Sequence, residues 1–259
     1  MTERAPVPGP GFAAVVDRLM AAGCVAAEEE AAELLADAPD DATLEERLRR
    51  RERGEPLAWL TGSIRFGGLR VRVDPGVYVP RFQTEELAHR AAALLPPGGR
   101  ALDLCTGAGA VAVHLRAAVP SATVIGVDLD PVAAVCARRN GVPAIVADLD
   151  AALRPRTTFD VVTAVAPYVP TRQLPLLPAD VLRYEPHGAL DGGDDGLELV
   201  RRVVEAAARL LRPGGRVLVE VGGDQDGLLA PTLDACGFGA VDSWRDADGD
   251  LRGIVAERR

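Results

Sequence analysis

The sequence predicts an α/β protein, in which a mostly parallel sheet carries helices on both faces and a small helical domain precedes it. Two observations lead to this prediction. From about residue 85 onward, short apolar runs typical of strands alternate with helical patterns, as in repeated β-α-β units. Residues from about 11 to 50 instead carry apolar side chains at helical spacing and are rich in good helix formers.

The N-terminal part is expected to be helical and to end in a hairpin. Three helices are predicted, at residues 11–23, 26–38 and 43–56. Gly54 and Pro56 stop the third helix, because neither residue continues a helix well. Residues 66–80 then alternate apolar and polar side chains around a turn at 74–76, which predicts a β-hairpin. We therefore divide the chain into a helical domain at 1–62, a hairpin linker at 63–80 and an α/β domain at 81–259.

The α/β domain is predicted element by element from the same patterns. Strands are expected at residues 100–107, 123–130, 143–148, 159–166 and 216–222, followed by two antiparallel strands within 239–258. Helices are expected at residues 84–95, 110–119, 131–140 and 196–211. Thr84 is a suitable N-cap for the first of these helices, and Pro131 suits the first turn of the third.

Composition argues against several classes of function. The chain of 259 residues has a net charge of −9 and a pI near 5.0, which argues against nucleic acid as a direct partner. It contains no lysine, which excludes a Walker phosphate loop and Schiff-base chemistry. The four cysteines lack metal-ligand spacing, and no apolar run is long enough to span a membrane. We expect a cytoplasmic protein with reduced thiols, no metal ion and no membrane partner.

A glycine-rich turn follows the first strand of the α/β domain, in the stretch "LDLCTGAGAVAV". It presents Asp103, Thr106, Gly107 and Gly109 at the carboxyl end of the strand, where open α/β sheets bind their ligands. Glycines at such a turn let the backbone approach a ligand closely. The turn lacks the third glycine of the dinucleotide pattern, and the residues alone leave a nucleoside or a dinucleotide equally open.

Two aspartates end the next two strands. Asp128 stands roughly 20 residues after the glycine turn, where a carboxylate can accept hydrogen bonds from both hydroxyls of a ribose. Its alternative role is an N-cap for the helix that begins near Pro131. Asp148 ends the following strand and could accept a hydrogen bond from an adenine amino group, or it could be a solvated acid in a loop.

Further motifs lie in order along nearly the whole chain, and together they resemble those of release-factor glutamine methyltransferases of the HemK/PrmC type. The matching stretches are "GEPLAWLTG", "VPRFQTEEL" where the family has Pro-Arg-Pro-x-Thr-Glu, "LDLCTGAG", "GVDLDPVAAVCARRN", "RYEPHGALDGGDDGLE" and "LRPGGRVLVEVGGDQ". The resemblance implies a Rossmann-like S-adenosylmethionine-dependent methyltransferase fold with a mostly parallel seven-stranded sheet. It also implies that the N-terminal helices recognise a substrate, which in this family is a peptide chain release factor.

The resemblance assigns the site residues by position. S-adenosylmethionine is expected to bind through Asp103, Thr106, Gly107, Gly109, Asp128 and Asp148. The catalytic loop is expected at Val165, Ala166, Pro167 and Tyr168, where the family has Asn-Pro-Pro-Tyr. Contacts to the cofactor or the substrate are expected from Arg81, Gln83, Thr84 and Glu85. Glu185, in "RYEP", also matches a family position, but the sequence assigns it no role.

Val165 departs from the family pattern, because a valine side chain cannot form the hydrogen bonds of the family's asparagine. In the family, that asparagine and the carbonyl after it bind the substrate amide and hold its nitrogen in line with the methyl group. Three interpretations follow. In the first, the chain is a glutamine methyltransferase in which another group replaces the asparagine; Gln83 is a candidate, although its position in a loop favours a solvated turn residue. In the second, it methylates a different acceptor, such as a small molecule. In the third, it binds the cofactor without catalysis.

Overall fold

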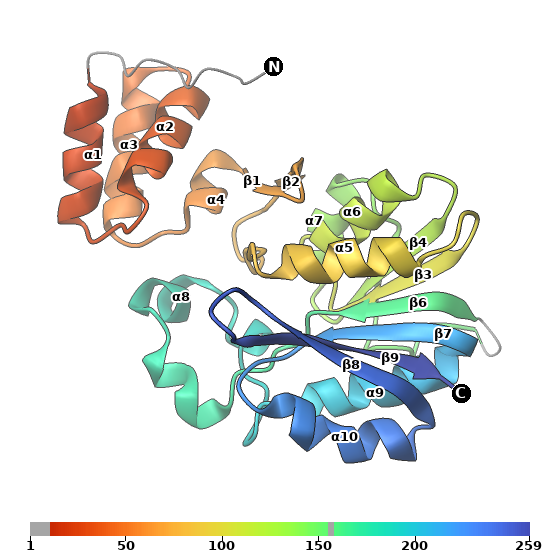
Figure 1. Cartoon of the computed structure of the whole chain (residues 1–259). Coiled ribbons are helices and arrows are strands. Elements are labelled where there is room, and N and C mark those ends of the chain that lie inside the picture. The colour runs from red at the N-terminus through yellow and green to blue at the C-terminus, as the bar shows by residue number, and fades with distance from the viewer. Residues whose placement is uncertain (1–10, 155–157) are drawn as a thin grey trace.

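A twisted sheet with helices on both faces forms the body of the molecule, and a helical lobe lies beside one end of it (Figure 1). The computed structural model describes residues 11–154 and 158–259, and within them seven strands form the main sheet in the order β5-β4-β3-β6-β7-β9-β8. These strands are β3 (Arg100–Leu104), β4 (Thr123–Asp128), β5 (Ala144–Val146), β6 (Phe159–Ala164), β7 (Leu211–Glu220), β8 (Phe238–Arg245) and β9 (Leu251–Arg258). The strands β3 to β7 are parallel, and β8 and β9 pair antiparallel, so the predicted fold class is confirmed.

Alternating side chains along each strand serve the two faces of the sheet. Val161 packs with the helices of one face, whereas its neighbour Val162 packs with the helices of the other, and both are fully buried. The first face is covered by α5 (Thr84–Leu94), α6 (Ala110–Ala118) and α7 (Pro131–Arg139). The second is covered by α9 (Glu198–Leu210) and α10 (Gln225–Ala235). The core is therefore two apolar layers with the sheet between them, built from small aliphatic side chains.

The helical lobe has a hydrophobic cluster of its own. It consists of α1 (Phe12–Ala21), α2 (Ala27–Asp37) and α3 (Asp41–Glu52), and the first ten residues of the predicted helical domain lie outside the described residues. Leu19, Leu34 and Leu48, one from each helix, are completely or almost completely buried against one another. Short α4 (Leu57–Thr61) leads from this lobe to the hairpin of β1 (Ser63–Phe66) and β2 (Leu69–Arg72).

Two local predictions were wrong in detail. The hairpin turn lies at Gly67 and Gly68 and not at 74–76. Both glycines have positive φ, 54° and 78°, as a two-residue hairpin turn of the primed type requires. Thr84 is the first residue of α5 and not its N-cap, because its hydroxyl donates a hydrogen bond to the distant carboxylate of Glu220.

Several short helices were not predicted. Three lie between β6 and α9, namely η1 (Thr171–Leu176), α8 (Ala179–Tyr184) and η2 (His187–Ala189). None of these three exceeds six residues, so their sequences are too short to display a helical repeat. The longer α10 was missed because Gly227 and Pro231 interrupt it. No helix in the described part of the chain is both long and apolar enough to cross a membrane.

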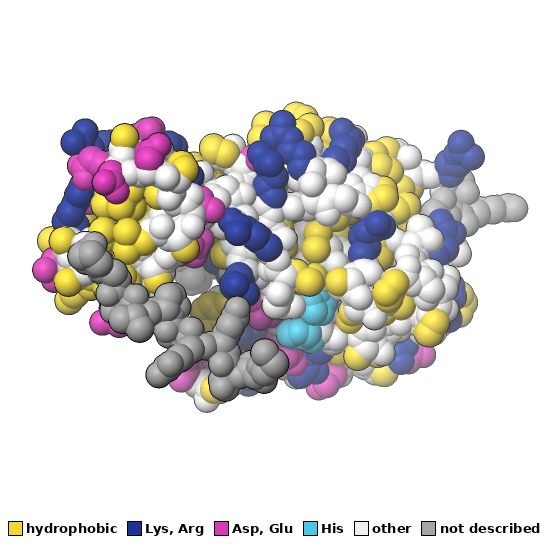
Figure 2. All heavy atoms as spheres, turned by 90° about the horizontal axis from the view of Figure 1, so that it is seen from above, with side chains coloured by type: hydrophobic (Ala, Val, Ile, Leu, Met, Phe, Trp, Pro, Cys, Tyr) yellow, Lys and Arg dark blue, Asp and Glu magenta, His cyan; other side chains and the backbone are white. Residues whose placement is uncertain are grey.

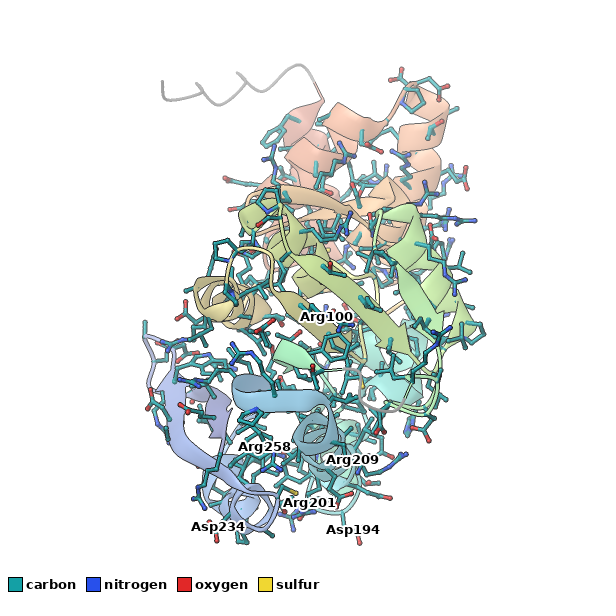
Figure 3. The ribbon with its side chains drawn as sticks, turned by 90° about the vertical axis from the view of Figure 1, so that its right-hand side faces the viewer. Arg100, Asp194, Arg201, Arg209, Asp234 and Arg258 are labelled. Carbon is teal, nitrogen blue, oxygen red and sulfur yellow. The ribbon has the colours of Figure 1, made fainter. Side chains whose placement is uncertain are left out.

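Figure 3 looks onto the end of the sheet at which the parallel strands begin. Arg100, the first residue of β3, places its guanidinium over the ring of Phe159, 5.2 Å from the ring centroid. Arg258, the last residue of antiparallel β9, donates to backbone carbonyls at the ends of α9 and α10. Arginines favour such carbonyls because a helix ends in a partial negative charge. These side chains therefore make structural contacts at the amino ends of the parallel strands, and the predicted site residues lie at the carboxyl ends.

Candidate active site

A cleft of about 600 Å³ lies where the helical lobe faces the carboxyl ends of the central strands. The lobe contributes the loop between α1 and α2, including Val25, together with residues of α2 and α3. The segment before α5 contributes Arg81 and Gln83. The loop after β6 contributes all of residues 165–169. The cleft thus brings together two of the three predicted groups of site residues, although they are about 80 positions apart in the chain.

The predicted catalytic loop leaves β6 as a mostly apolar wall of this cleft. Val165 is half-buried, and Ala166 and Pro167 are buried. Tyr168 is half-buried, and its hydroxyl donates a hydrogen bond to Oε1 of Glu220 at 3.0 Å. Burial raises the pKa of the Tyr168 hydroxyl, so this side chain acts as a neutral donor.

Glu220 joins the two chain segments that line the cleft. This carboxylate ends β7 and is only 3% exposed. Its Oε2 accepts from the Thr84 hydroxyl at 2.6 Å, while its Oε1 accepts from Tyr168. Burial raises the pKa of Glu220, and the two hydroxyls act in the opposite direction because they stabilise the charged form. Sequence analysis missed this residue, although an acid at the end of the apolar run "RVLVE" was a signal for it.

Glu185 holds the segment before α5 in the same way. Its side chain is buried and accepts a hydrogen bond from the backbone N–H of Val79 at 3.2 Å and another from Arg81. The Arg81 guanidinium also stacks over the Tyr78 ring, 5.0 Å from its centroid. The sequence assigned no role to Glu185, and these contacts indicate that it positions the Arg81–Gln83 segment over the cleft.

Gln225 holds the backbone of the catalytic loop from the other side. This buried amide donates through Nε2 to the carbonyl of Tyr168 at 2.9 Å and accepts through Oε1 from the N–H of Gly222. Gly196 packs so closely here that a Cβ would come within 2.3 Å of the same Tyr168 carbonyl. Gln225 was not predicted, because nothing in its local sequence distinguishes it from a surface residue.

The glycine-rich turn after β3 lies beside the catalytic loop. Asp103 is buried, and its two oxygens accept from the hydroxyls of Thr106 at 2.6 Å and Thr163 at 2.7 Å. Thr163 stands two residues before Val165, so one carboxylate connects the glycine turn to the start of the catalytic loop. Burial raises the pKa of Asp103 to about 6, although both hydroxyls favour its charged form.

Asp128 points back at the glycine turn. Its oxygens accept from the backbone N–H of Gly107 at 2.8 Å and of Asp130 at 2.9 Å. The alternative role of Asp128 as a helix N-cap is wrong, because Asp130 caps α7 by accepting from the N–H of Val132. Burial raises the pKa of the Asp128 carboxyl, and the two backbone N–H groups oppose this shift.

The backbone of the glycine turn is open at Gly107. Gly107 has a φ of 56°, and a Cβ built on it would meet no atom within 4 Å. Its backbone therefore faces open space directly beside the Asp128 carboxylate. Gly109 differs, since a Cβ there would lie 3.1 Å from Ala137, so its glycine serves close helix packing. Cys105, two residues before Gly107, also has a positive φ of 54°, a backbone strain that concentrates at functional turns.

Asp148 and Glu85, two further predicted site residues, lie outside the lining of the cleft. Asp148 follows β5, and both of its oxygens accept from Arg202 at 2.8 Å on the surface. An adenine amino group would have to share this carboxylate with the arginine. Glu85 lies in the first turn of α5 and is half-buried, and the structure places it next to Thr84 without bringing it into the cleft lining.

Comparisons with known proteins agree with this geometry. A family model described as "Methyltransferase domain" matches residues 78–245. A release factor glutamine methyltransferase of Cereibacter sphaeroides is 36% identical and aligns over 94% of this chain and 95% of its own. That of Geobacter sulfurreducens is also 36% identical, over 78% of this chain and 73% of its own. Among solved structures, one similar chain is the T. Thermophilus 16S rRNA N2 G1207 methyltransferase in complex with AdoMet and guanosine, with a TM-score of 0.53 and 24% sequence identity. The alignment covers 76% of this chain and 50% of that chain, and at this identity the similarity is one of fold alone.

The position of Asp128 leads to a first prediction. Asp128→Ala should weaken binding of S-adenosylmethionine by about 1.5–3 kcal/mol, because a charge-assisted hydrogen bond to a ribose hydroxyl is lost. Isothermal titration measures the change. Asp130→Ala is the matched control, since it removes a neighbouring carboxylate that caps α7, and its affinity should equal that of the wild type. Equal affinity in both variants would remove the ribose role from Asp128.

Asp103 gives a prediction about stability and pH. Its pKa of about 6 in the folded chain exceeds the unfolded value of roughly 3.9, so the folded state holds this proton more tightly. The free energy of unfolding should therefore fall as the pH rises from about 4 to about 6, by up to about 3 kcal/mol from this group. Urea unfolding of wild type and Asp103→Asn across this range should show the steeper fall in the wild type. Parallel pH profiles would contradict the assignment.

Proposed function

The chain belongs to the release factor glutamine methyltransferase family, and from this premise we propose that it methylates the side-chain amide of a glutamine in a peptide chain release factor. One observation carries the proposal. Asp103 and Thr163 connect the glycine turn to the wall of the cleft, so a methyl donor at the turn and an acceptor in the cleft would be neighbours. Release factors act on the ribosome, which makes the cytoplasm the expected location.

S-adenosylmethionine is the methyl donor in this proposal, and when bound it supplies a methyl group on a positively charged sulfonium. The open space at Gly107 and the adjacent Asp128 carboxylate support a nucleoside at this turn. The Asp128 carboxylate would accept hydrogen bonds from the ribose hydroxyls.

The remaining task of the cleft is to orient a weak nucleophile. The nitrogen of a glutamine amide shares its lone pair with the carbonyl, so it reacts only when held in line with the methyl carbon. In the transfer, this nitrogen forms the new N–C bond, the S–C bond breaks with its electron pair on sulfur, and one amide proton passes to water. The backbone carbonyl of Ala166 can accept from the amide N–H, because Gln225 fixes the backbone of this loop.

A second candidate function is methylation of another acceptor in the same cleft. The observation in its favour is the apolar wall at Val165 and Ala166, which offers no side-chain hydrogen bond to an amide. An acceptor with a stronger nucleophile would need less orientation than an amide nitrogen does. A transfer assay with labelled methyl donor would identify this acceptor as the molecule that becomes labelled.

Methyl transfer with radiolabelled S-adenosylmethionine tests the proposed function. Purified release factor and a complete cell extract serve as acceptors, and mass spectrometry locates the new methyl group. The proposal expects the mass of one glutamine side chain to increase by roughly 14 Da, because one hydrogen is replaced by a methyl group. Label on a small molecule alone would support the second candidate, and binding of the donor without transfer to any acceptor would overturn both.

The helical lobe is proposed to recognise the acceptor. Val25, in the loop between α1 and α2, lines the cleft and is fully exposed. Figure 2 shows apolar side chains open to solvent on this lobe, between groups of acidic ones. A protein acceptor that enters the cleft would cover Val25, and burying one valine stabilises a complex by about 1.5 kcal/mol.

A substitution in the lobe gives the next prediction. Val25→Glu should raise the KM for release factor roughly tenfold, since about 1.4 kcal/mol of apolar contact is lost, while binding of S-adenosylmethionine stays unchanged. Steady-state kinetics and titration measure the two quantities. Met20→Glu is the matched control, because Met20 is 63% exposed on the same lobe and lies outside the cleft lining. An equal KM in the two variants would contradict the recognition role.

A further inference from the structure

The cleft needs a side chain that can form hydrogen bonds to an acceptor amide, because Val165 cannot form them. A glutamine amide offers two N–H groups and one C=O, and these groups need partners when they leave water, since an unpaired buried polar group is unfavourable. Val165 has no polar side-chain atom, and the carbonyl of Ala166 can only accept. A donor for the acceptor's C=O must therefore come from elsewhere in the cleft. This inference rests on the proposed function, which makes the acceptor a glutamine amide.

The arginines that line the cleft are already paired with carboxylates. Arg51 binds Glu30 at 2.6 Å, and both side chains are only 13% exposed. Arg252 binds Asp246 at 2.6 Å. Breaking such a pair to bind a neutral amide leaves a charge without its partner, which is unfavourable.

Two further donors of the cleft lining are engaged as well. Arg81 binds the buried Glu185 and stacks over Tyr78. The hydroxyl of Tyr168 donates its one proton to Glu220. These groups shape the cleft and do not supply a free donor to an incoming amide.

Gln83 has the chemistry that is missing. It lines the cleft together with Val165 and Tyr168, and its side chain is half-exposed. Within the described part of the chain its amide takes part in no hydrogen bond, whereas Gln225 uses both ends of its own. An amide carries a donor and an acceptor in one plane, so it can bind another amide through two antiparallel hydrogen bonds.

The position of Gln83 relative to the catalytic loop is fixed by one carboxylate. Thr84, the next residue, binds one oxygen of Glu220, and Tyr168 binds the other. The two donors therefore lie on opposite sides of a single buried group. Glu185 anchors the other end of this segment through Val79 and Arg81. The backbone at Gln83 is thereby held in place relative to the catalytic loop.

We propose that Gln83 binds the acceptor amide in place of the asparagine that Val165 replaces. Its Nε2 donates to the acceptor's C=O, and its Oε1 accepts from an N–H. The second N–H faces the carbonyl of Ala166. Held at these points, the nitrogen keeps the face that carries its lone pair toward the methyl carbon. Gln83 would then be a catalytic residue, because it touches the reacting amide.

The direct test replaces Gln83 and follows transfer to the release-factor glutamine. Gln83→Ala should lower kcat/KM at least about tenfold, which corresponds to about 1.4 kcal/mol of barrier. Titration should show an unchanged Kd for S-adenosylmethionine, because the glycine turn is untouched. Gln173→Ala is the matched control, since Gln173 is an exposed glutamine of η1 outside this cleft, and it should keep full activity.

A second variant tests the role itself. Gln83→Ala combined with Val165→Asn returns a donor and an acceptor to the cleft from the opposite wall. It should recover at least about tenfold of the activity that Gln83→Ala loses. Gln83→Glu keeps an acceptor of the same length but has no donor when ionised, so it should not recover activity.

The outcomes separate this inference from the proposed function. If the wild type methylates the glutamine and Gln83→Ala does so equally fast, Gln83 has no role and the proposed function stands. If Gln83→Ala loses S-adenosylmethionine binding, the residue serves the donor site and the inference is overturned. If the wild type binds S-adenosylmethionine but methylates no glutamine, the proposed function fails and this inference fails with it. A tenfold loss with rescue by Val165→Asn supports it.

Discussion

The buried carboxylate of Glu220 is the interaction on which the cleft depends. It stands at the end of β7, between β6 and β9 in the sheet, and it accepts hydrogen bonds from the hydroxyls of Thr84 and Tyr168. A buried carboxylate without donors is strongly unfavourable, so both segments are drawn to it. The start of α5 and the loop after β6 thereby acquire a fixed spacing that neither segment could maintain alone.

The short helix α8 extends this organisation to the helical lobe. The hydroxyl of Tyr184 donates to the carbonyl of Arg53 at 3.2 Å, and the Tyr184 ring meets Trp59 edge-on at a centroid distance of 6.3 Å. The next residue, Glu185, binds the segment before α5. Two consecutive residues thus connect the lobe and the linker to the catalytic part, and the cleft lies between the surfaces that they join.

Sequence reasoning succeeded where the signal was local. The alternation of strands and helices predicted the sheet, and the glycine turn with Asp128 could be located because its residues are close in the chain. It failed where a partner was distant. Thr84 looked like a helix cap, but it binds a residue 136 positions away, and Glu185 binds a backbone N–H 106 positions away. Such contacts depend on the tertiary fold, and a single sequence contains no pattern that announces them.

The hydrogen bonds that hold the predicted catalytic loop do not involve the side chain of Val165, which packs against the apolar core. Gln225 binds the carbonyl of Tyr168, and Glu220 binds its hydroxyl. A polar side chain at residue 165 would therefore change the surface that this wall of the cleft offers to an acceptor, while the hydrogen bonds of Gln225 and Glu220 to Tyr168 stay in place.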